Sequence, residues 1–165
     1  GASEVQGERA PYFMPFLFGE RCPGWQEEKA GGFYGVRGSH NEFDLYYSIL
    51  EGVLFNMYQC YQILSEIGGT PDDVIMSGGI LKSPLWSQMA ADIFQREILA
   101  TGVANDSTVG TALIALESVG GINSVEDYRP AVTMKFTPQD DNMKTYESRY
   151  AKYLDLYAEL KQASF

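Results

Sequence analysis

The sequence predicts an α/β fold in which a mostly parallel sheet is flanked by helices. Two observations support this fold class. Short apolar runs at 74–76 and 97–101 are typical of strands, and each precedes a longer segment whose apolar residues recur at helical spacing. Strands that alternate with helices usually lie parallel in one sheet. The 165 residues, 45% of them hydrophobic, suffice for one domain with its own core.

Residues 1–38 are expected to form short strands and loops. Prolines and glycines interrupt any helical register there, and the aromatic residues between them favour extended pairing. A long helix is expected next, with Ser39 as a candidate N-cap and with its end at Gly68 and Gly69. Its packing stripe is predicted from residues at helical spacing: Leu45, Ile49, Val53, Asn56, Met57 and Tyr61.

The run Val74–Met76 is predicted to be a buried strand that ends in a glycine turn at Gly78 and Gly79. A second helix should follow, because Ser83 is a good N-cap and Pro84 suits the first helical position. The apolar residues expected on its packing side are Leu85, Trp86, Met89, Ala90, Ile93 and Phe94.

The strand at 97–101 leads to a third helix, which Asp106 and Ser107 are expected to begin and Gly120 and Gly121 to end. Its apolar positions are Val109, Leu113 and Leu116. Residues 122–139 are interpreted as a connection with one short turn near 125–127.

The last helix is expected to run from Pro138 toward Lys161, and residues 140–162 are interpreted as a C-terminal docking helix. Aromatic residues three and four apart form one stripe along it, and such a stripe usually packs on the rest of a domain. The stripe consists of Tyr146, Tyr150, Tyr153, Tyr157 and Leu160.

Composition excludes several classes of function. The formal net charge of −10 gives no broad basic surface, so we expect no nucleic-acid partner. The longest apolar run, near 14–18, is far shorter than the ~20 residues of a membrane helix, so no membrane partner is expected. Two cysteines, Cys22 and Cys60, are too few for a disulfide scaffold and lack metal-ligand spacing, which favours reduced thiols and a cytoplasmic location.

The segment 74–84 is the best candidate site, because a strand ends there in two glycines and leads into a capped helix. Glycines without a Cβ allow a ligand to lie against the backbone, and free N–H groups at a helix start attract anions. Together these features suit a nucleotide. An ordinary tight turn is the alternative, and the segment matches neither a Walker loop nor a GxGxxG fingerprint.

Other polar residues give weaker signals. His40 is the only histidine, and without a nucleophile elbow it is interpreted as a loop or helix-start residue. The carboxylates Asp44, Glu51 and Asp92 are interpreted as solvated or capping charges. Glu20, embedded beside Arg21 in an aromatic loop, has two open interpretations: an internal ion pair, or a role facing a cleft.

Read together, four ordered blocks resemble the C-terminal part of the FGGY family of carbohydrate kinases. The family's second signature contains a small residue, an aromatic residue, a glycine, a spacer, and a helix that ends in serine, two hydrophobic residues and an acid, and residues 31–51 match it. The other three blocks are 16–23, 77–93 and 107–112. Details in 51–56 and 91–94 look more like gluconokinases than xylulokinases.

The resemblance implies a ribonuclease H-like, actin-like ATPase fold, in which 1–165 form a C-terminal, ATP-binding domain portion that lacks the first strands of its own domain. ATP, Mg²⁺ and a small sugar or sugar acid are the implied ligands, and an N-terminal kinase domain is the implied partner. The implied ATP-binding residues are Ser77, Gly78, Gly79, Lys82 and Ser83. Leu17, Glu20 and Arg21 are candidate sugar-side residues of the cleft.

The resemblance also implies what this chain does not contribute. The family's catalytic aspartate belongs to the N-terminal domain and matches no position here, and no metal ligand is assigned. The 165 residues alone are therefore expected to be inactive, with gluconate as the first choice of substrate for the whole enzyme and xylulose or another FGGY substrate as the second. The alternative from another class is a non-catalytic domain that oligomerises, for example as a homodimer, through an exposed edge and the tyrosine helix.

Overall fold

The computed structural model describes residues 7–102 and 106–160. None of the helices in this described part is long and apolar enough to cross a membrane. The elements follow in the order η2 (Gly7–Arg9), β1 (Tyr12–Met14), β2 (Gly32–Tyr34), α1 (Glu42–Gly68), β3 (Val74–Met76), η3 (Gly78–Lys82), α2 (Pro84–Phe94), β4 (Ile98–Thr101), α3 (Asp106–Ser118), η4 (Val125–Asp127), β5 (Val132–Phe136) and α4 (Asp140–Leu160).

The aromatic residues of the N-terminal segment pair as expected. β1 and β2 form an antiparallel ribbon in which Tyr12 lies opposite Tyr34 and Phe13 opposite Phe33. The Phe13 and Phe33 rings are 4.8 Å apart between centroids, a separation typical of favourable aromatic pairs. This ribbon packs against α1.

A second sheet has the strand order β3-β4-β5. β3 and β4 are parallel and are connected through α2, so the predicted alternation and the α/β fold class are confirmed. β5 then pairs antiparallel with β4, which makes the sheet mixed. The interpretation of 122–139 as a connection was therefore incomplete: it contains η4 at the expected turn and also β5. The alternation of apolar and polar residues in Val132–Phe136 is a strand signal that the interpretation overlooked.

The N-terminus of α1 is capped by Asn41, not by Ser39 as predicted. Asn41 Oδ1 accepts hydrogen bonds from the backbone N–H groups of Phe43 (2.9 Å) and Asp44 (3.2 Å). Asp44 Oδ2 accepts one from the Asn41 backbone N–H at 2.9 Å, which completes a capping box. The Gly68-Gly69 end of this helix is confirmed.

The packing stripe predicted for α1 was wrong except for Tyr61, which packs against the core. The buried face consists of Asp44, Tyr47, Ser48, Leu50, Glu51, Gly52, Leu54 and Phe55, whereas Met57 is exposed and the other predicted residues are half-buried. Hydropathy misplaced the stripe because polar residues with internal partners share the buried face. On α2 the predicted side is confirmed, since Met89, Ala90, Ile93 and Phe94 are buried.

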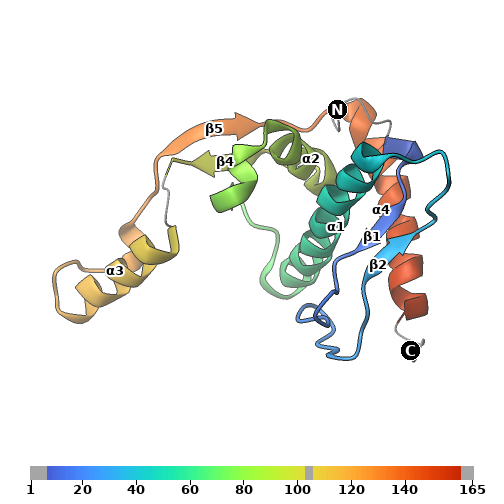
Figure 1. Ribbon diagram of the computed structural model, residues 1–165. Helices are drawn as coiled ribbons and strands as arrows, with labels where there is room; N and C mark the ends of the chain where they lie inside the picture. Colours follow the sequence, from blue (N-terminus) through green and yellow to red (C-terminus); the bar gives the residue numbers. More distant parts are fainter. Residues whose placement is uncertain (1–6, 103–105, 161–165) are drawn as a thin grey trace.

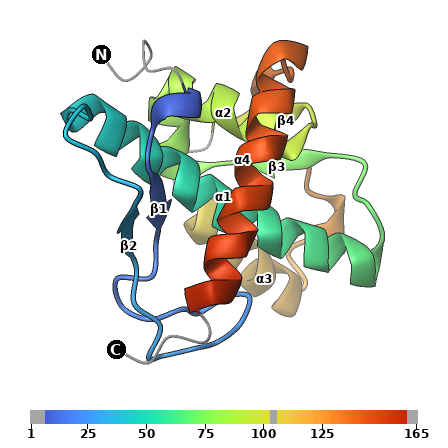
Figure 2. The same ribbon diagram turned by 90° about the vertical axis from the view of Figure 1, so that its right-hand side faces the viewer.

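The tyrosine stripe of α4 packs on the core, as predicted from its spacing. Tyr146, Tyr150, Tyr153 and Leu160 are buried, and Tyr153 is fully enclosed. The hydroxyls of Tyr146 and Tyr47 are 2.7 Å apart and link α4 to α1. Figure 2 shows α4 crossing in front of α1 and α2. Residues 161 and 162 of the proposed docking helix lie outside the described residues.

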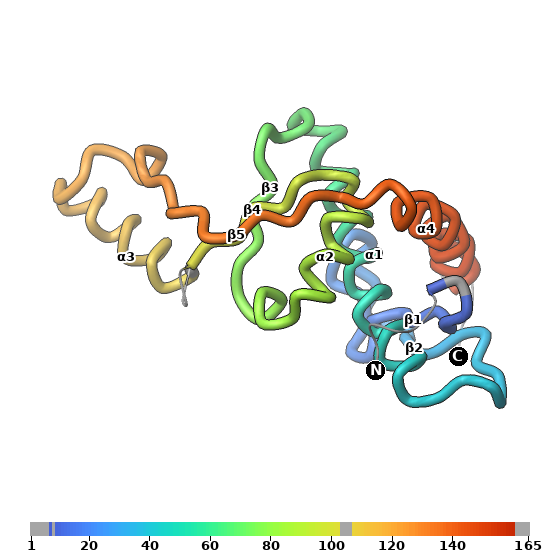
Figure 3. Tube along the Cα trace, turned by 90° about the horizontal axis from the view of Figure 1, so that it is seen from above, coloured from blue at the N-terminus to red at the C-terminus, as the bar shows by residue number. Residues whose placement is uncertain are grey.

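α3 projects away from the other helices. It lies with η4 at the far end of β4 and β5, opposite α4 (Figures 1 and 3). The predicted glycine end is confirmed, with Gly120 in a left-handed conformation (φ +73°) two residues after Ser118, the last residue of the helix. None of residues 107–118 is buried, so the apolar positions Val109, Leu113 and Leu116 lack a covering layer.

Candidate functional site

The backbone changes direction sharply where β3 ends. The backbone of Ser77 is extended, and Gly78 then adopts φ +84°, a backbone conformation that residues with a Cβ rarely adopt. The chain turns there into η3, which leads directly to α2. The glycine turn predicted from the sequence is therefore confirmed, although its two glycines are the first residues of a short 3₁₀ helix, η3, which precedes α2.

The surface above this turn is open. A Cβ built on Gly78 or on Gly79 would meet no atom within 4 Å, and Ser77, Gly78, Gly79 and Lys82 are all exposed. The Cβ at these two glycines would not collide with this chain, so packing within the chain does not require them to be glycine. An exposed backbone without Cβ atoms allows a ligand to approach closely.

Ser83 caps α2 as predicted. Its Oγ accepts a hydrogen bond from the Trp86 backbone N–H at 3.3 Å, and Pro84 occupies the first helical turn. The Ser83 N–H donates to Ile80 O at 3.1 Å, which connects η3 to α2. The hydroxyl proton of this half-buried serine has no role in the cap and is available to a ligand.

A pocket of about 260 Å³ lies beside the turn, at the carboxyl ends of the parallel strands β3 and β4. Ligands of open α/β sheets usually bind at this edge. Of the five predicted ATP-binding residues only Ser77 lines the pocket, while Gly78, Gly79, Lys82 and Ser83 continue from it along the surface. The lining is mainly apolar: Ile75, Ser77, Thr101, Val109, Gly110, Leu113, Tyr128 and Pro130.

Sequence reasoning missed most of these lining residues. Ile75 was expected inside a buried strand, yet 49% of it is exposed, because β3 is an edge strand and α3 leaves room for the pocket. Thr101 could have been found from the rule that carboxyl ends of parallel strands meet at one edge of a sheet. Nothing in the sequence indicated Tyr128 or Pro130, which follow η4.

Leu17, Glu20 and Arg21, the candidate sugar-side residues, occupy the loop between β1 and β2. Leu17 is 63% exposed. Arg21 is exposed as well: its guanidinium lies 3.7 Å from Glu27 Oε1 and 5.3 Å from the centroid of the Trp25 ring. These two residues are available on the surface, and their cleft role remains a prediction.

Glu20 is 1% exposed and forms the internal ion pair that was one of its two interpretations. Lys29 Nζ lies 3.0 Å from Oε2, the Gly24 N–H donates to Oε1 at 2.8 Å, and the Tyr157 hydroxyl also donates to Oε1. Burial alone would raise the pKa of this carboxyl, but the hydrogen bonds from Tyr157, Gly24 and Lys29 outweigh it and hold the pKa below its usual range. Both oxygens are thus engaged within the chain.

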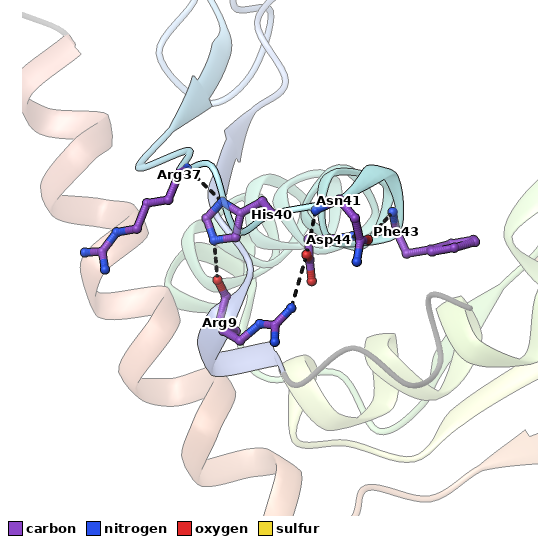
Figure 4. Close-up of polar contacts among 6 residues, drawn as sticks. All are labelled: Arg9, Arg37, His40, Asn41, Phe43 and Asp44. Atoms are coloured by element: carbon purple, nitrogen blue, oxygen red, sulfur yellow. Dashed lines mark hydrogen bonds and ion pairs between the residues drawn. The ribbon is translucent and has the colours of Figure 1, made fainter.

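His40 has the structural role that was expected. Its Nδ1 accepts a hydrogen bond from the Arg37 backbone N–H at 3.0 Å, and its Nε2 lies 2.9 Å from Arg9 O (Figure 4). The two contacts together assign the proton to Nε2, which donates to the carbonyl. Across residues 7–102 and 106–160, no group of three His, Cys, Asp or Glu side chains could hold a metal ion.

A family model identifies the chain. Residues 2–118 match the model described as "FGGY family of carbohydrate kinases, C-terminal domain". The chain belongs to the FGGY family of carbohydrate kinases. The resemblance inferred from the four sequence blocks is confirmed.

Two curated relatives illustrate the match of this FGGY chain. A xylulose kinase from Staphylococcus epidermidis is 30% identical over 164 residues, which cover 98% of this chain and 33% of the relative. A gluconokinase from Bacillus subtilis is 31% identical over 147 residues, which cover 87% of this chain and 29% of the relative. The chain therefore spans about a third of the length of these kinases.

Solved structures agree with the fold. A ligand-bound xylulose kinase from Lactobacillus acidophilus superposes with a TM-score of 0.82 at 24% identity, covering 99% of this chain and 34% of that one. A gluconate kinase from the same organism gives a TM-score of 0.81 at 24% identity, with the same coverage. This FGGY chain thus has the fold of the C-terminal part of these kinases, the fold class that the resemblance implied.

Proposed function

We propose that this chain is the nucleotide-binding C-terminal part of an ATP-dependent carbohydrate kinase, which transfers the γ-phosphate of ATP to a hydroxyl of a sugar or sugar acid. The observation that supports this function is the open glycine turn beside a pocket at the carboxyl edge of β3 and β4, in a chain of the FGGY family. Gluconate is the proposed substrate, because residues 51–56 and 91–94 look more like gluconokinases, and xylulose is the second candidate.

The proposal divides the nucleotide between two surfaces. The exposed backbone at Gly78 and Gly79 can lie against polar parts of the nucleotide, with Lys82 and the Ser83 hydroxyl as neighbouring donors. The mainly apolar walls of the pocket suit a flat base. A pocket of about 260 Å³ is large enough for part of a nucleotide, and Ser77 in its lining directly precedes the glycine turn.

The proposal assigns the chemical step to a part of the kinase outside these 165 residues. A general base must lie within hydrogen-bond reach of the sugar hydroxyl, and the described lining of the pocket beside the turn contains no carboxylate or histidine. Magnesium, which accompanies nucleotides in phosphoryl transfer, finds no ligand cluster among the described residues, so we assign it no residue. The chain by itself is proposed to bind nucleotide without phosphorylating sugar.

Nucleotide binding can be tested by titrating the chain with ATP and Mg²⁺ while the fluorescence of Trp86 is followed. Trp86 lies close to the proposed site, because its backbone N–H donates a hydrogen bond to Ser83 Oγ. A Trp25→Phe background removes the chain's other tryptophan, which is exposed in a different loop. Saturable change in fluorescence is expected, and its absence would contradict the nucleotide role.

Gly79→Ala locates the ligand. Its new Cβ would touch nothing in this chain, so folding should be unaffected. The Cβ would occupy space that a bound nucleotide needs, and we therefore expect at least a tenfold loss of affinity for ATP. Gly68→Ala is the matched control, because it adds the same methyl group to an equally open position at the end of α1. Ser83→Ala should weaken binding modestly. Equal affinities for the Gly79 and Gly68 variants would overturn the proposed site.

Identifying the substrate requires an assay of the intact gene product. A panel of sugars and sugar acids, assayed with ATP on that product, should give the highest kcat/KM with gluconate. A preference for xylulose would replace gluconate within the same proposal, whereas ATP-dependent phosphorylation by the 165 residues alone would refute the division of roles between the two parts.

The tyrosine helix does not support the alternative of an oligomerisation domain. The tyrosine helix on which it depended has its aromatic stripe buried within this chain, with Tyr146, Tyr150 and Tyr153 each less than 10% exposed. The stripe is therefore unavailable to a second subunit.

A further inference from the structure

A basic pocket lies where the ends of the β1–β2 ribbon meet α4. It has a volume of about 320 Å³, and none of its lining residues belongs to the segment 77–83 or to the pocket beside that segment. We call it the arginine pocket and define it by six of its lining residues: Arg9, Tyr12, Tyr34, Arg37, His40 and Arg149.

The pocket concentrates positive charge in a strongly acidic chain. Three of the six arginines of a protein with net charge −10 line this one cavity. Among the side chains that the structure describes, no carboxylate lines it. The nearest acidic partners are Asp44, whose Oδ2 lies 3.4 Å from Arg9, and Glu51, which is bound to Arg149; both carboxylates are only 1% exposed. The cations therefore face the pocket while their counter-charges are buried behind them.

Arg149 is held rigidly in the wall. Its Nε and Nη2 donate to the two oxygens of Glu51, each at 2.6 Å, and its guanidinium lies 4.5 Å from the centroid of the Tyr12 ring. This bidentate contact uses one edge of the guanidinium, and Nη1 makes no hydrogen bond to the described residues. A guanidinium fixed in this way loses little conformational entropy when it binds a ligand.

Arg37 is a second cation of the pocket and, unlike Arg149, its side chain is not bound to a carboxylate among the described residues. Its backbone is fixed, because its N–H donates to His40 Nδ1, and His40 Nε2–H in turn donates to Arg9 O. Its exposed guanidinium has no ion pair with any side chain that the structure describes, and Figure 4 shows it extending away from the hydrogen-bonded cluster. The histidine thus positions two pocket arginines, one through each ring nitrogen.

We propose that the arginine pocket binds a small phosphomonoester. Arginine guanidiniums are the side chains best suited to phosphate oxygens, which they contact with paired N–H donors. A phosphate group offers three oxygens, so it can satisfy several arginines around a cavity, whereas a carboxylate offers two in one plane. The volume is at the lower end of the range for small-ligand pockets, and the Tyr12 and Tyr34 side chains supply flat walls for the remainder of the ligand.

Calorimetric titration of the 165-residue chain with inorganic phosphate, at low and constant salt, tests the proposal. One phosphate per chain is expected, with an affinity at least tenfold above that of acetate. Arg37→Ala should weaken phosphate binding about tenfold or more, which corresponds to the loss of one charge-assisted hydrogen bond. Arg37→Lys, which keeps the charge but not the paired donors, should fall between the two.

Arg129→Ala is the matched control, because it removes the same charge from an exposed arginine whose side chain contacts only nearby backbone carbonyls. It should leave phosphate affinity unchanged. Gly79→Ala should also leave it unchanged; a loss there would place the phosphate at the glycine turn and overturn the proposal. Equal losses in the Arg37 and Arg129 variants, equal affinity for acetate, or no binding at all would overturn it as well. Circular dichroism of each variant verifies folding.

Discussion

At the scale of single residues, the buried carboxylates serve structure. Asp44, Glu51 and Asp92 were interpreted as solvated or capping charges, yet each is only 1% exposed. The capping role is confirmed for Asp44, and the solvated alternative was wrong for all three. Glu51 binds Arg149, and Asp92 accepts hydrogen bonds from Gln88, Gln139 and Asn142, which ties α2 to the start of α4.

The sequence could reveal local partners of such residues, but not distant ones. The N-cap role of Ser83 depends on a residue three positions away, and it was predicted. The partner of Glu51 is 98 residues away on α4, and no spacing rule connects two residues at that separation. No spacing rule connects Glu20 with Lys29, nine residues away in a loop, or with Tyr157, 137 residues away, so these partners could not be named in advance, although the need of Glu20 for a partner could.

Glu20→Gln should destabilise the chain by about 3 kcal/mol, because it removes one charge of a buried ion pair. The native pKa of Glu20 is lowered relative to the unfolded chain, so its ionisation contributes stability above the unfolded value of about 4.3, and this contribution is lost as the pH falls through the native pKa. Urea unfolding at several pH values measures this contribution. The difference in the free energy of unfolding between wild type and variant should be constant above about pH 5 and shrink below about pH 4.

Glu27→Gln is the control for that measurement. Glu27 pairs with Arg21 at 3.7 Å, and both side chains are about 70% exposed. Its substitution should change stability by less than about 0.5 kcal/mol. A pH-independent difference for Glu20→Gln, or equal effects of the two substitutions, would show that the Glu20 charge contributes nothing specific.

At the scale of elements, the sequence predicted where helices begin and end better than which face they bury. End signals are local, such as Pro84 at the start of α2 and Gly120 after α3. The buried face of α1 depends on contacts with β1 that periodicity cannot reveal. Gly52 shows this dependence: a Cβ there would lie 2.1 Å from the Phe13 carbonyl oxygen, so the glycine sets the distance between α1 and β1.

Gly52→Ala should therefore destabilise the chain by about 3 kcal/mol, although alanine is normally the better helix residue. Gly110→Ala is the matched control, since it lies inside α3 and its Cβ would meet nothing within 4 Å. The control should be stabilised by about 0.5–1 kcal/mol. Thermal or urea unfolding of both variants measures the contrast. A neutral or stabilising Gly52→Ala would mean that α1 and β1 can separate at little cost.

At the scale of the whole molecule, the core lies at one end and the proposed nucleotide surface near the other. α1, α2 and α4 pack around a shared core that includes Tyr47, Phe55, Met89 and Tyr153. The pocket beside the turn borders α3, which has no buried residue within 107–118. The sequence could not predict this asymmetry, because the apolar spacing of α3 resembles that of a packed helix, and its exposure follows from which elements surround it.

Hydrogen exchange should reveal this difference as unequal protection of two helices of similar length. α2 has 11 residues and buries seven of them, so its amides should exchange with free energies near that of global unfolding. The amides of α3 should open at a much lower free energy, because few apolar contacts hold it against the sheet. Saturating ATP with Mg²⁺ should then slow exchange selectively in η3 and α3, since a ligand that bridges the turn and the pocket must order both. Equal protection of α2 and α3 in the free chain would contradict the first expectation, and a uniform slowing across all helices would contradict the second.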